Sequence, residues 1–340
     1  MSLWCPYRFA LAMYREDSTS LGTVPAEPNW EPGHEWTRFY HQRKGSLSLA
    51  ANGSASVLPV WDEAAGEPYC RGYRIEIAEP GRAVVAADFS VAHFHEVADS
   101  LASAFVKQDK LRAGERYTYE LVAYRKPPET TVAGGLAVID ASPPVPAREA
   151  TLSEYLSRAE PSGVVDREDM PVFVPGEVLE QIRAQTRAHE GCETGGILIG
   201  RLGRDAAAQE IFVEVTAQIP ADYTLGNEVK LTFTAETWLA ADSALRLRHR
   251  QETYLGWWHG HPVKRWCSAR GCSLEAQRNC RLARDFFSTD DVAVMRAAFP
   301  RAWCIAIVAN DTAFSDITFS MFGNRNGLMQ PRGFYVREGD

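Results

Sequence analysis

Long hydrophobic runs are missing from this sequence. No apolar stretch approaches the length of about 18 residues that indicates a membrane-spanning helix. The first residues, MSLWCPYRFALAMYRED, have no basic segment before an apolar one and no small-residue cleavage site, which are the marks of a signal peptide. We therefore expect a cytoplasmic protein that spans no membrane.

An excess of positive charge is also missing. The chain has 36 lysines and arginines against 44 aspartates and glutamates, a net charge of -8. Such a balance argues against general binding to nucleic acids. Cysteines are few and odd in number, at seven, and they are scattered. Without a secretion signal, that pattern indicates reduced thiols or metal ligands rather than a disulfide framework.

What is present is the composition of a globular protein. Hydrophobic residues make up 45% of the chain, charged residues 24% and aromatic residues 11%. These proportions exclude a mainly disordered chain, a collagen and a coiled coil. A length of 340 residues predicts about two domains.

Proline marks the predicted boundary between the domains. Proline lacks an amide hydrogen and restricts the residue before it, so a proline-rich segment resists regular structure. We predict an N-terminal domain over 1–126, a linker over 127–169 with a short helix at 151–160, a second domain over 170–325 and a C-terminal tail over 326–340. The prolines of this region are Pro127, Pro128, Pro143, Pro144, Pro146, Pro161, Pro171 and Pro175.

The first domain is predicted to be α+β. Segments 8–16, 73–79 and 117–125 alternate in polarity as half-buried strands do, and 92–108 has the spacing of a helix. No chemical motif stands out in this part, so the residues alone do not indicate its function.

The second domain alternates strands and helices more clearly, which predicts an α/β domain. In the helix predicted at 176–190, Val178, Leu179 and Ile182 share one face. Strands are predicted at 170–175, 193–202, 210–219, 253–262, 302–310 and 316–323, and further helices at 235–251 and 287–299.

Three fragments of this domain carry groups that could perform chemistry. In GWWHGHP, His259 and His261 are two residues apart, and on a strand such side chains point to the same face. Two imidazoles aimed at one point suit zinc, and a catalytic zinc uses three protein ligands with the fourth position left for water. Asp291, at the start of the next predicted helix, is the third candidate ligand.

A zinc site of this kind needs further groups. Zinc lowers the pKa of its water to about 7 and thereby produces a nucleophile at neutral pH. Glu193, at the start of the glycine-rich segment ETGGILIG, is the candidate that takes the proton of the water and passes it to a leaving group. Ser288 could donate a hydrogen bond to a developing oxyanion.

Simpler interpretations of each fragment stay open. Ser288 and Asp291 have the spacing of a helix cap, a role compatible with the catalytic one. Glu193 taken alone could be a surface charge at a strand end. A second histidine pair, His93 and His95, opens a predicted helix, where residues two apart diverge, so we assign that pair no metal. A nucleophilic role for Cys192 would leave the zinc-binding set unused.

The order of the fragments, ETGGILIG then GWWHGHP then S-x-x-D, resembles the JAB/MPN+ (JAMM) metalloprotease family over about 170–325. The resemblance implies a cytidine-deaminase-like mixed sheet flanked by helices, with His259, His261 and Asp291 as zinc ligands. It also implies that Glu193 is the general base and then the general acid, and that Ser288 stabilises the oxyanion. Gly260 departs from the serine or threonine usual between the histidines.

A larger departure is an insert over 263–287, in which 26 residues separate His261 from Ser288. The insert is rich in arginine and borders the expected site, so we expect it to shape the entry of the substrate. It also holds Cys267, Cys272 and Cys280, which could bind a second, structural zinc, although the spacing fits no standard zinc finger and names no fourth ligand. The alternative is that these cysteines are small buried apolar groups.

The resemblance implies an isopeptidase or peptidase that cleaves after the C-terminal glycine of a ubiquitin-like protein. It further implies a role beside E1-like and E2-like proteins in a bacterial conjugation operon, in some cases in antiviral defence, with the N-terminal domain binding the substrate or a partner. An alternative substrate is a sulfur-carrier protein whose C-terminal glycines need trimming. A non-catalytic MPN scaffold and a RadC-like protein associated with nucleic acid are alternatives from other classes.

Overall fold

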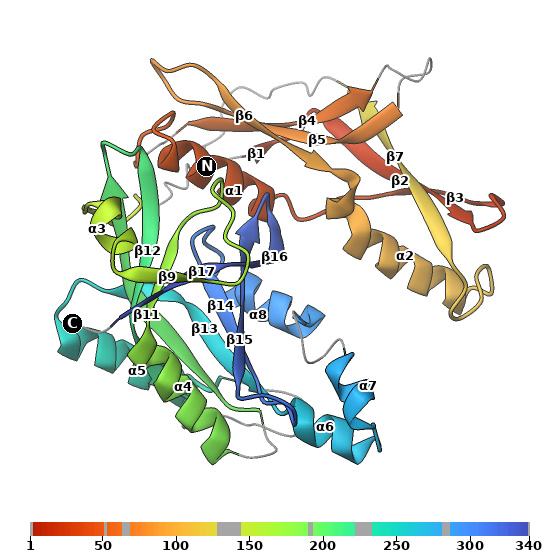
Figure 1. Ribbon diagram of the computed structural model, residues 1–340. Helices are drawn as coiled ribbons and strands as arrows, with labels where there is room; N and C mark the ends of the chain where they lie inside the picture. The colour runs from red at the N-terminus through yellow and green to blue at the C-terminus, as the bar shows by residue number, and fades with distance from the viewer. Residues whose placement is uncertain are drawn as a thin grey trace. The chain divides into compact units, whose positions relative to one another are not determined.

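The computed structural model describes residues 3–50, 53–62, 69–127, 144–189, 193–221, 233–280 and 286–338. The fold is mixed α+β with two sheets (Figure 1). The chain divides into two compact units, which confirms the prediction of two domains with both helices and strands. Unit 1 comprises Met1–Val145 with Asn326–Leu328, and unit 2 comprises Pro146–Arg325 with Met329–Asp340.

In its described residues, unit 1 has one sheet and two α-helices. Its described strands follow the order β1-β4-β5-β7-β2-β3, and β6 pairs with β5. The elements are β1 (Leu3–Trp4), β2 (Tyr7–Arg15), β3 (Ser20–Pro25), α1 (Glu31–Arg43), β4 (Ser54–Asp62), β5 (Tyr69–Ala78), β6 (Val85–Ser90), the 3-10 turn η1 (Val91–Phe94), α2 (His95–Lys107) and β7 (Tyr117–Arg125).

The core of unit 1 lies between this sheet and its helices. Alternate residues of β2, namely Phe9, Leu11 and Met13, are buried and face the same cluster as Phe39 of α1 and Phe105 of α2. Because both helices share one core with the strands, they cover the same face of the sheet (Figure 1). The strands predicted at 8–16, 73–79 and 117–125 are present as β2, β5 and β7, and the face that each buries lies under the helices.

Unit 2 contains a mixed sheet with the order β16-β15-β14-β13-β11-β12-β10-β17-β9 among the described strands, and β8 pairs with β11. Its elements are β8 (Ala147–Glu149), α3 (Leu152–Leu156), β9 (Ala159–Ser162), β10 (Val172–Pro175), α4 (Gly176–Ala188), β11 (Gly195–Asp205), β12 (Glu210–Pro220), α5 (Ala235–Arg248), β13 (Thr253–His261), α6 (Val263–Ala269), α7 (Leu274–Arg278), α8 (Thr289–Ala298), β14 (Ile305–Asn310), β15 (Thr318–Arg325), β16 (Leu328–Arg332) and β17 (Phe334–Arg337).

Strand β13 lies inside this sheet, parallel to β14 and antiparallel to β11. All six residues of β14 are buried, as expected of a strand covered on both faces. Helix α4 buries Val178, Leu179 and Ile182, the face predicted from its sequence. Among the described residues, no helix is both long and apolar enough to cross a membrane.

The predicted boundaries differ from the structure in two places. Within the predicted linker, 144–169 contains β8, α3 and β9, and β8 and β9 pair with strands of the unit 2 sheet. The predicted tail contains β16 and β17, and β17 pairs in parallel with β10. These strands escaped prediction because they are short and mostly half-buried or exposed, so they show no alternation in polarity. Residues 128–143 lie outside the described residues.

Candidate metal centre

The two histidines of GWWHGHP end strand β13, and both are buried, with exposed fractions of 1% for His259 and 2% for His261. Residues two apart on a strand point to one face, and here their Nε2 atoms lie only 2.9 Å apart. A Cβ built on Gly260, between them, would lie 3.1 Å from Cγ2 of Thr186 on α4. Helix α4 therefore lies on the opposite side of the strand from the imidazoles, and a side chain at position 260 would crowd it.

Asp291 offers a third candidate ligand atom from the first turn of α8. Ser288 and Asp291 form a capping box, in which the Asp291 amide donates to Ser288 Oγ (3.1 Å) and the Ser288 amide donates to Asp291 Oδ2 (2.7 Å). The Ser288 hydroxyl also donates to Asp291 Oδ2 at 2.8 Å. With Oδ2 held in this way, Oδ1 lies 3.7 Å from His259 Nε2. The cap predicted from the sequence is therefore present, and it orients the carboxylate toward the histidines.

The chemistry of this donor set fits a divalent metal ion. The ligand atoms of His259, His261 and Asp291 all lie within 4.8 Å of one another. Burial lowers the pKa of each histidine to about 3, so both imidazoles are neutral at ordinary pH and can offer lone pairs. The Nδ1 atoms of both rings are buried without a hydrogen-bond partner. Neutral imidazoles with one carboxylate are ligands that zinc accepts, and three of them leave a coordination position open.

Neighbouring side chains fix the two imidazoles in place. The indole of Trp257 stacks on the ring of His259, with ring centroids 4.4 Å apart and planes 17° apart. Asn310 of β14 pairs in register with His261, and its Nδ2 donates to Ser320 Oγ at 3.2 Å. That bond leaves the Asn310 carbonyl oxygen, which is buried, as the polar group beside the His261 ring.

Asn310 was missed in the sequence because it ends a strand that is otherwise apolar, AWCIAIVAN. The signal that could have indicated Asn310 as a site residue is its place as a lone polar residue at the end of a buried strand. Trp258, the neighbour of Trp257, instead points into the core and donates from Nε1 to Gln218 Oε1 at 3.0 Å.

A pocket of about 640 Å³ opens beside the three candidate ligands. Glu193, His261, Ser288 and Asp291 line it together. Glu193 stands just before β11, and the Thr194 carbonyl that follows it accepts a hydrogen bond from the Gly260 amide at 2.8 Å. The position of Glu193 is thus tied to the histidine strand. The Asp291 carboxyl in this pocket has a pKa raised above its ordinary value by burial.

The insert forms another part of the pocket wall. Trp266 and Arg270 line the pocket, as does Phe286, and the Trp266 ring centroid is 5.2 Å from that of His261. The sequence predicted that the insert would border the site but did not indicate which of its residues would do so. Cys267 on α6 is buried, while Cys272 and Cys280 are half-buried, and all three are free thiols. Cys192 and 281–285 lie outside the described residues.

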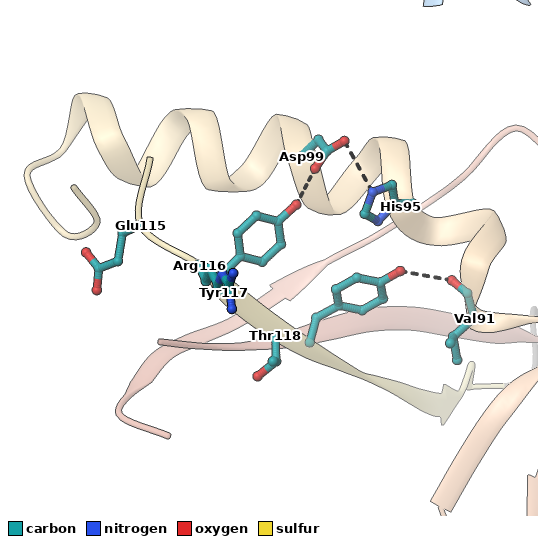
Figure 2. Close-up of a pocket in the computed structure, with 8 residues that line it drawn as sticks. Val91, His95, Asp99, Glu115, Arg116, Tyr117 and Thr118 are labelled. Atoms are coloured by element: carbon teal, nitrogen blue, oxygen red, sulfur yellow. Dashed lines mark hydrogen bonds and ion pairs between the residues drawn. The ribbon is translucent and has the colours of Figure 1, made fainter. Parts of the chain in front are cut away.

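The other histidine pair belongs to unit 1. His93 lies in η1, where Nδ1 is 3.1 Å from the Tyr73 hydroxyl and Nε2 is 3.0 Å from the Asn326 carbonyl oxygen. His95 opens α2, and its Nε2 lies 3.7 Å from Asp99 Oδ2 in a shallow pocket between α2 and β7 (Figure 2). The two rings thus have different partners, as expected where a turn passes into a helix.

No family model matches the chain, and no curated protein matches it. Among solved structures, the chain is similar to the solution structure of protein DSY2949 from Desulfitobacterium hafniense, with a TM-score of 0.34 and 16% sequence identity. The match covers 49% of this chain and 94% of the other. A likeness at this level carries no conclusion about function.

Proposed function

We propose that the chain is a zinc-dependent isopeptidase or peptidase that cleaves after the C-terminal glycine of a ubiquitin-like protein. The observation that carries the proposal is the cluster of two neutral, buried imidazoles and one carboxylate, with ligand atoms within 4.8 Å of one another. Glu193 and Ser288 line the pocket beside that cluster. The resemblance of the ordered motifs to the JAMM metalloproteases supports the reaction class.

His259, His261 and Asp291 would hold the metal. When bound there, zinc would lower the pKa of a water molecule to about 7 and polarise the carbonyl of the scissile bond. Glu193 accepts the proton of the water and then delivers it to the departing amine, the task of a general base that becomes a general acid. The capping box keeps the Asp291 carboxylate turned toward the histidines throughout.

Ser288 stabilises the developing oxyanion with its hydroxyl. In the free protein this hydroxyl donates to Asp291 Oδ2, and the Ser288 backbone amide already satisfies the same carboxylate oxygen. The hydroxyl can therefore turn toward the substrate without leaving that oxygen unpaired. One well-placed donor of this kind contributes about 10²–10³-fold to turnover in other hydrolases.

The substrate proposal rests on the shape of the pocket and on the family resemblance. Three aromatic side chains line the pocket, those of Trp257, Trp266 and Phe286. Glycine, which lacks a side chain, can pass such walls and let its backbone approach the reacting groups closely. We propose that a glycine-rich C-terminal tail enters here in an extended conformation. We further propose that unit 1 binds the ubiquitin-like protein or an E1-like or E2-like partner. The protein would act in the cytoplasm, in antiviral defence.

The decisive variant for this proposal is Glu193→Gln. The zinc-loaded chain should cleave a ubiquitin-like protein fused through its terminal glycine to a reporter, and Glu193→Gln should lower turnover by about 10²–10⁴-fold because it removes the proton acceptor. Zinc content should not change, since Glu193 is not a ligand. Glu177→Gln, an exposed glutamate at the start of α4, is the matched control and should keep full turnover.

Two outcomes would overturn the assignment. Full turnover of the Glu193→Gln variant would reject Glu193 as the base. A purified protein with no metal at the histidine cluster would instead favour a non-catalytic scaffold.

A further inference from the structure

A second group of potential metal ligands lies in the insert. The cysteine cluster consists of Cys267 on α6, Cys272 in the turn that follows, and Cys280 just after α7. The Cys272 amide donates to the Cys267 carbonyl (3.0 Å), and Gln277 Nε2 donates to the Cys272 carbonyl (3.1 Å). The Cys280 amide then donates to the Gln277 carbonyl at 3.1 Å. These bonds fold the segment back on itself.

The fold of the segment brings the thiols together. Burial, and after it the neighbouring thiols of Cys280 and Cys272, raise the pKa of Cys267 to about 11. Three free thiols converging within 14 residues (267–280) is not the arrangement expected of cysteines that merely fill a core. Only Cys267 is fully buried, and the other two are half-exposed to solvent.

The two helices that carry the cluster are short. They are seven and five residues long, far below the ~12–15 residues at which an isolated helix becomes marginally stable in water. Their buried residues are Val263, Cys267 and Gln277. A cross-link between the cysteines would hold these two short helices in place. A metal ion can join all three thiols in this way.

The charge of the segment also suits a metal thiolate. Its described part carries Lys264, Arg265, Arg270 and Arg278 against Glu275. Three thiolates around a divalent zinc have a net charge of -1, which nearby cations stabilise.

We propose that Cys267, Cys272 and Cys280 bind a structural zinc ion that is separate from the histidine cluster. Binding breaks three S–H bonds, releases three protons to solvent and forms three Zn–S bonds, with no change in oxidation state. Zn–S bonds of ~2.3 Å bring the sulfur atoms to about 3.8 Å from one another. Among the described residues, the histidine cluster alone has three potential ligand atoms within 4.8 Å of one another. The three sulfur atoms do not all lie that close to one another, so they must move closer together as the ion binds.

The consequence for the pocket follows from Trp266, the residue before Cys267. Its ring centroid lies 5.2 Å from that of His261, and Arg270, one turn further on, also lines the pocket. An ion that fixes Cys267 therefore fixes the wall of the pocket. This inference does not depend on the proposed reaction, because it concerns metal content and the order of the insert.

The test is zinc per chain, measured by elemental analysis on four proteins. We expect two zinc ions in the parent chain, one in the triple variant Cys267→Ser, Cys272→Ser, Cys280→Ser, and one in the double variant His259→Asn, His261→Asn. Cys5→Ser, which alters a half-buried cysteine of unit 1, is the matched control and should keep two. Equal zinc in the parent and the triple variant would overturn the second site, whereas equal zinc in the parent and the double variant would overturn the histidine centre alone.

Cobalt substitution gives a test that does not require the triple variant to fold. The cysteine cluster should give the parent and the double histidine variant a thiolate-to-cobalt charge-transfer band in the near ultraviolet, because the histidine centre has no sulfur ligand. Absence of that band from the cobalt-loaded parent would overturn the proposal.

Discussion

Histidines separated by one residue occur twice in this chain, once in each unit. His259 and His261 lie on strand β13, where alternate side chains share a face, and their Nε2 atoms are 2.9 Å apart. His93 and His95 straddle the junction of η1 and α2, and one contacts Tyr73 while the other contacts Asp99. The same spacing thus gives a convergent pair in one region and a divergent pair in the other.

The surroundings of the two pairs differ as much as their backbones. The unit 2 pair is buried, neutral and next to a carboxylate that a capping box orients. In unit 1, His95 and Asp99 are largely exposed, and the Tyr117 hydroxyl also contacts Asp99 (Figure 2). Burial keeps an imidazole neutral, and a neutral imidazole can bind a metal ion. Two histidines separated by one residue therefore indicate a metal site only when they lie on a strand and are buried.

The largest expected effect comes from removing ligands at one pair or the other. His259→Asn or His261→Asn should lose the catalytic metal and lower turnover by about 10³-fold or more, since a metal ion contributes several kcal/mol of transition-state stabilisation. His93→Asn and His95→Asn should keep both metal content and turnover. Elemental analysis and single-turnover cleavage of a ubiquitin-like fusion would measure both. Loss of zinc from the His93→Asn or His95→Asn variant would contradict the claim that the unit 2 pair, and not the unit 1 pair, binds the metal.

Ser288 sharpens the comparison because each pair has a serine cap nearby. Ser90 caps the turn that carries His93, and Ser288 caps the helix that carries Asp291. Ser288→Ala should cost about 0.5–2 kcal/mol of stability and also lower kcat by about 10²-fold or more, with zinc retained. Ser90→Ala should affect stability alone. An unchanged kcat in the Ser288→Ala variant would leave Ser288 as a cap with no part in the reaction.

The last expected effect concerns stability rather than turnover, and it is a pH dependence of the unfolding free energy in the chelated protein. Burial lowers the pKa of His259 and His261 from 6.5 to about 3, so the unfolded chain binds more protons than the folded protein between those values. The free energy of unfolding should therefore fall as the pH decreases from about 6.5 toward 3.

The control for this pH dependence is again the other pair. Urea denaturation at several pH values should show a weaker dependence for the double variant His259→Gln, His261→Gln than for the parent. The double variant His93→Gln, His95→Gln should retain the dependence of the parent. An unaltered dependence after removal of the unit 2 pair would contradict the proposed state of the two imidazoles.

The sequence was most informative where burial is periodic. It predicted a strand over 253–262 and a helix over 176–190, and the structure has Thr253–His261 and Gly176–Ala188. Helix α1 was missed because the residues that it buries include His34, Glu35, Arg38 and Gln42, so that no apolar stripe marks its inner face.

The site was predictable to the extent that its members sit in recognisable fragments. His259, His261, Asp291, Glu193 and Ser288 all stand in such fragments, and the structure gathers them in one region. The contributions of Trp266, Arg270 and Asn310 could not be predicted, because each depends on contacts between segments distant in sequence rather than on local spacing.

The most direct test of the central claim is a crystal structure of the zinc-loaded chain, with anomalous scattering measured at the zinc edge. The account predicts an anomalous peak about 2.0–2.2 Å from Nε2 of His259, Nε2 of His261 and a carboxylate oxygen of Asp291, with the Glu193 carboxylate facing it across the pocket. An absence of zinc between these three side chains in fully loaded protein would contradict the account.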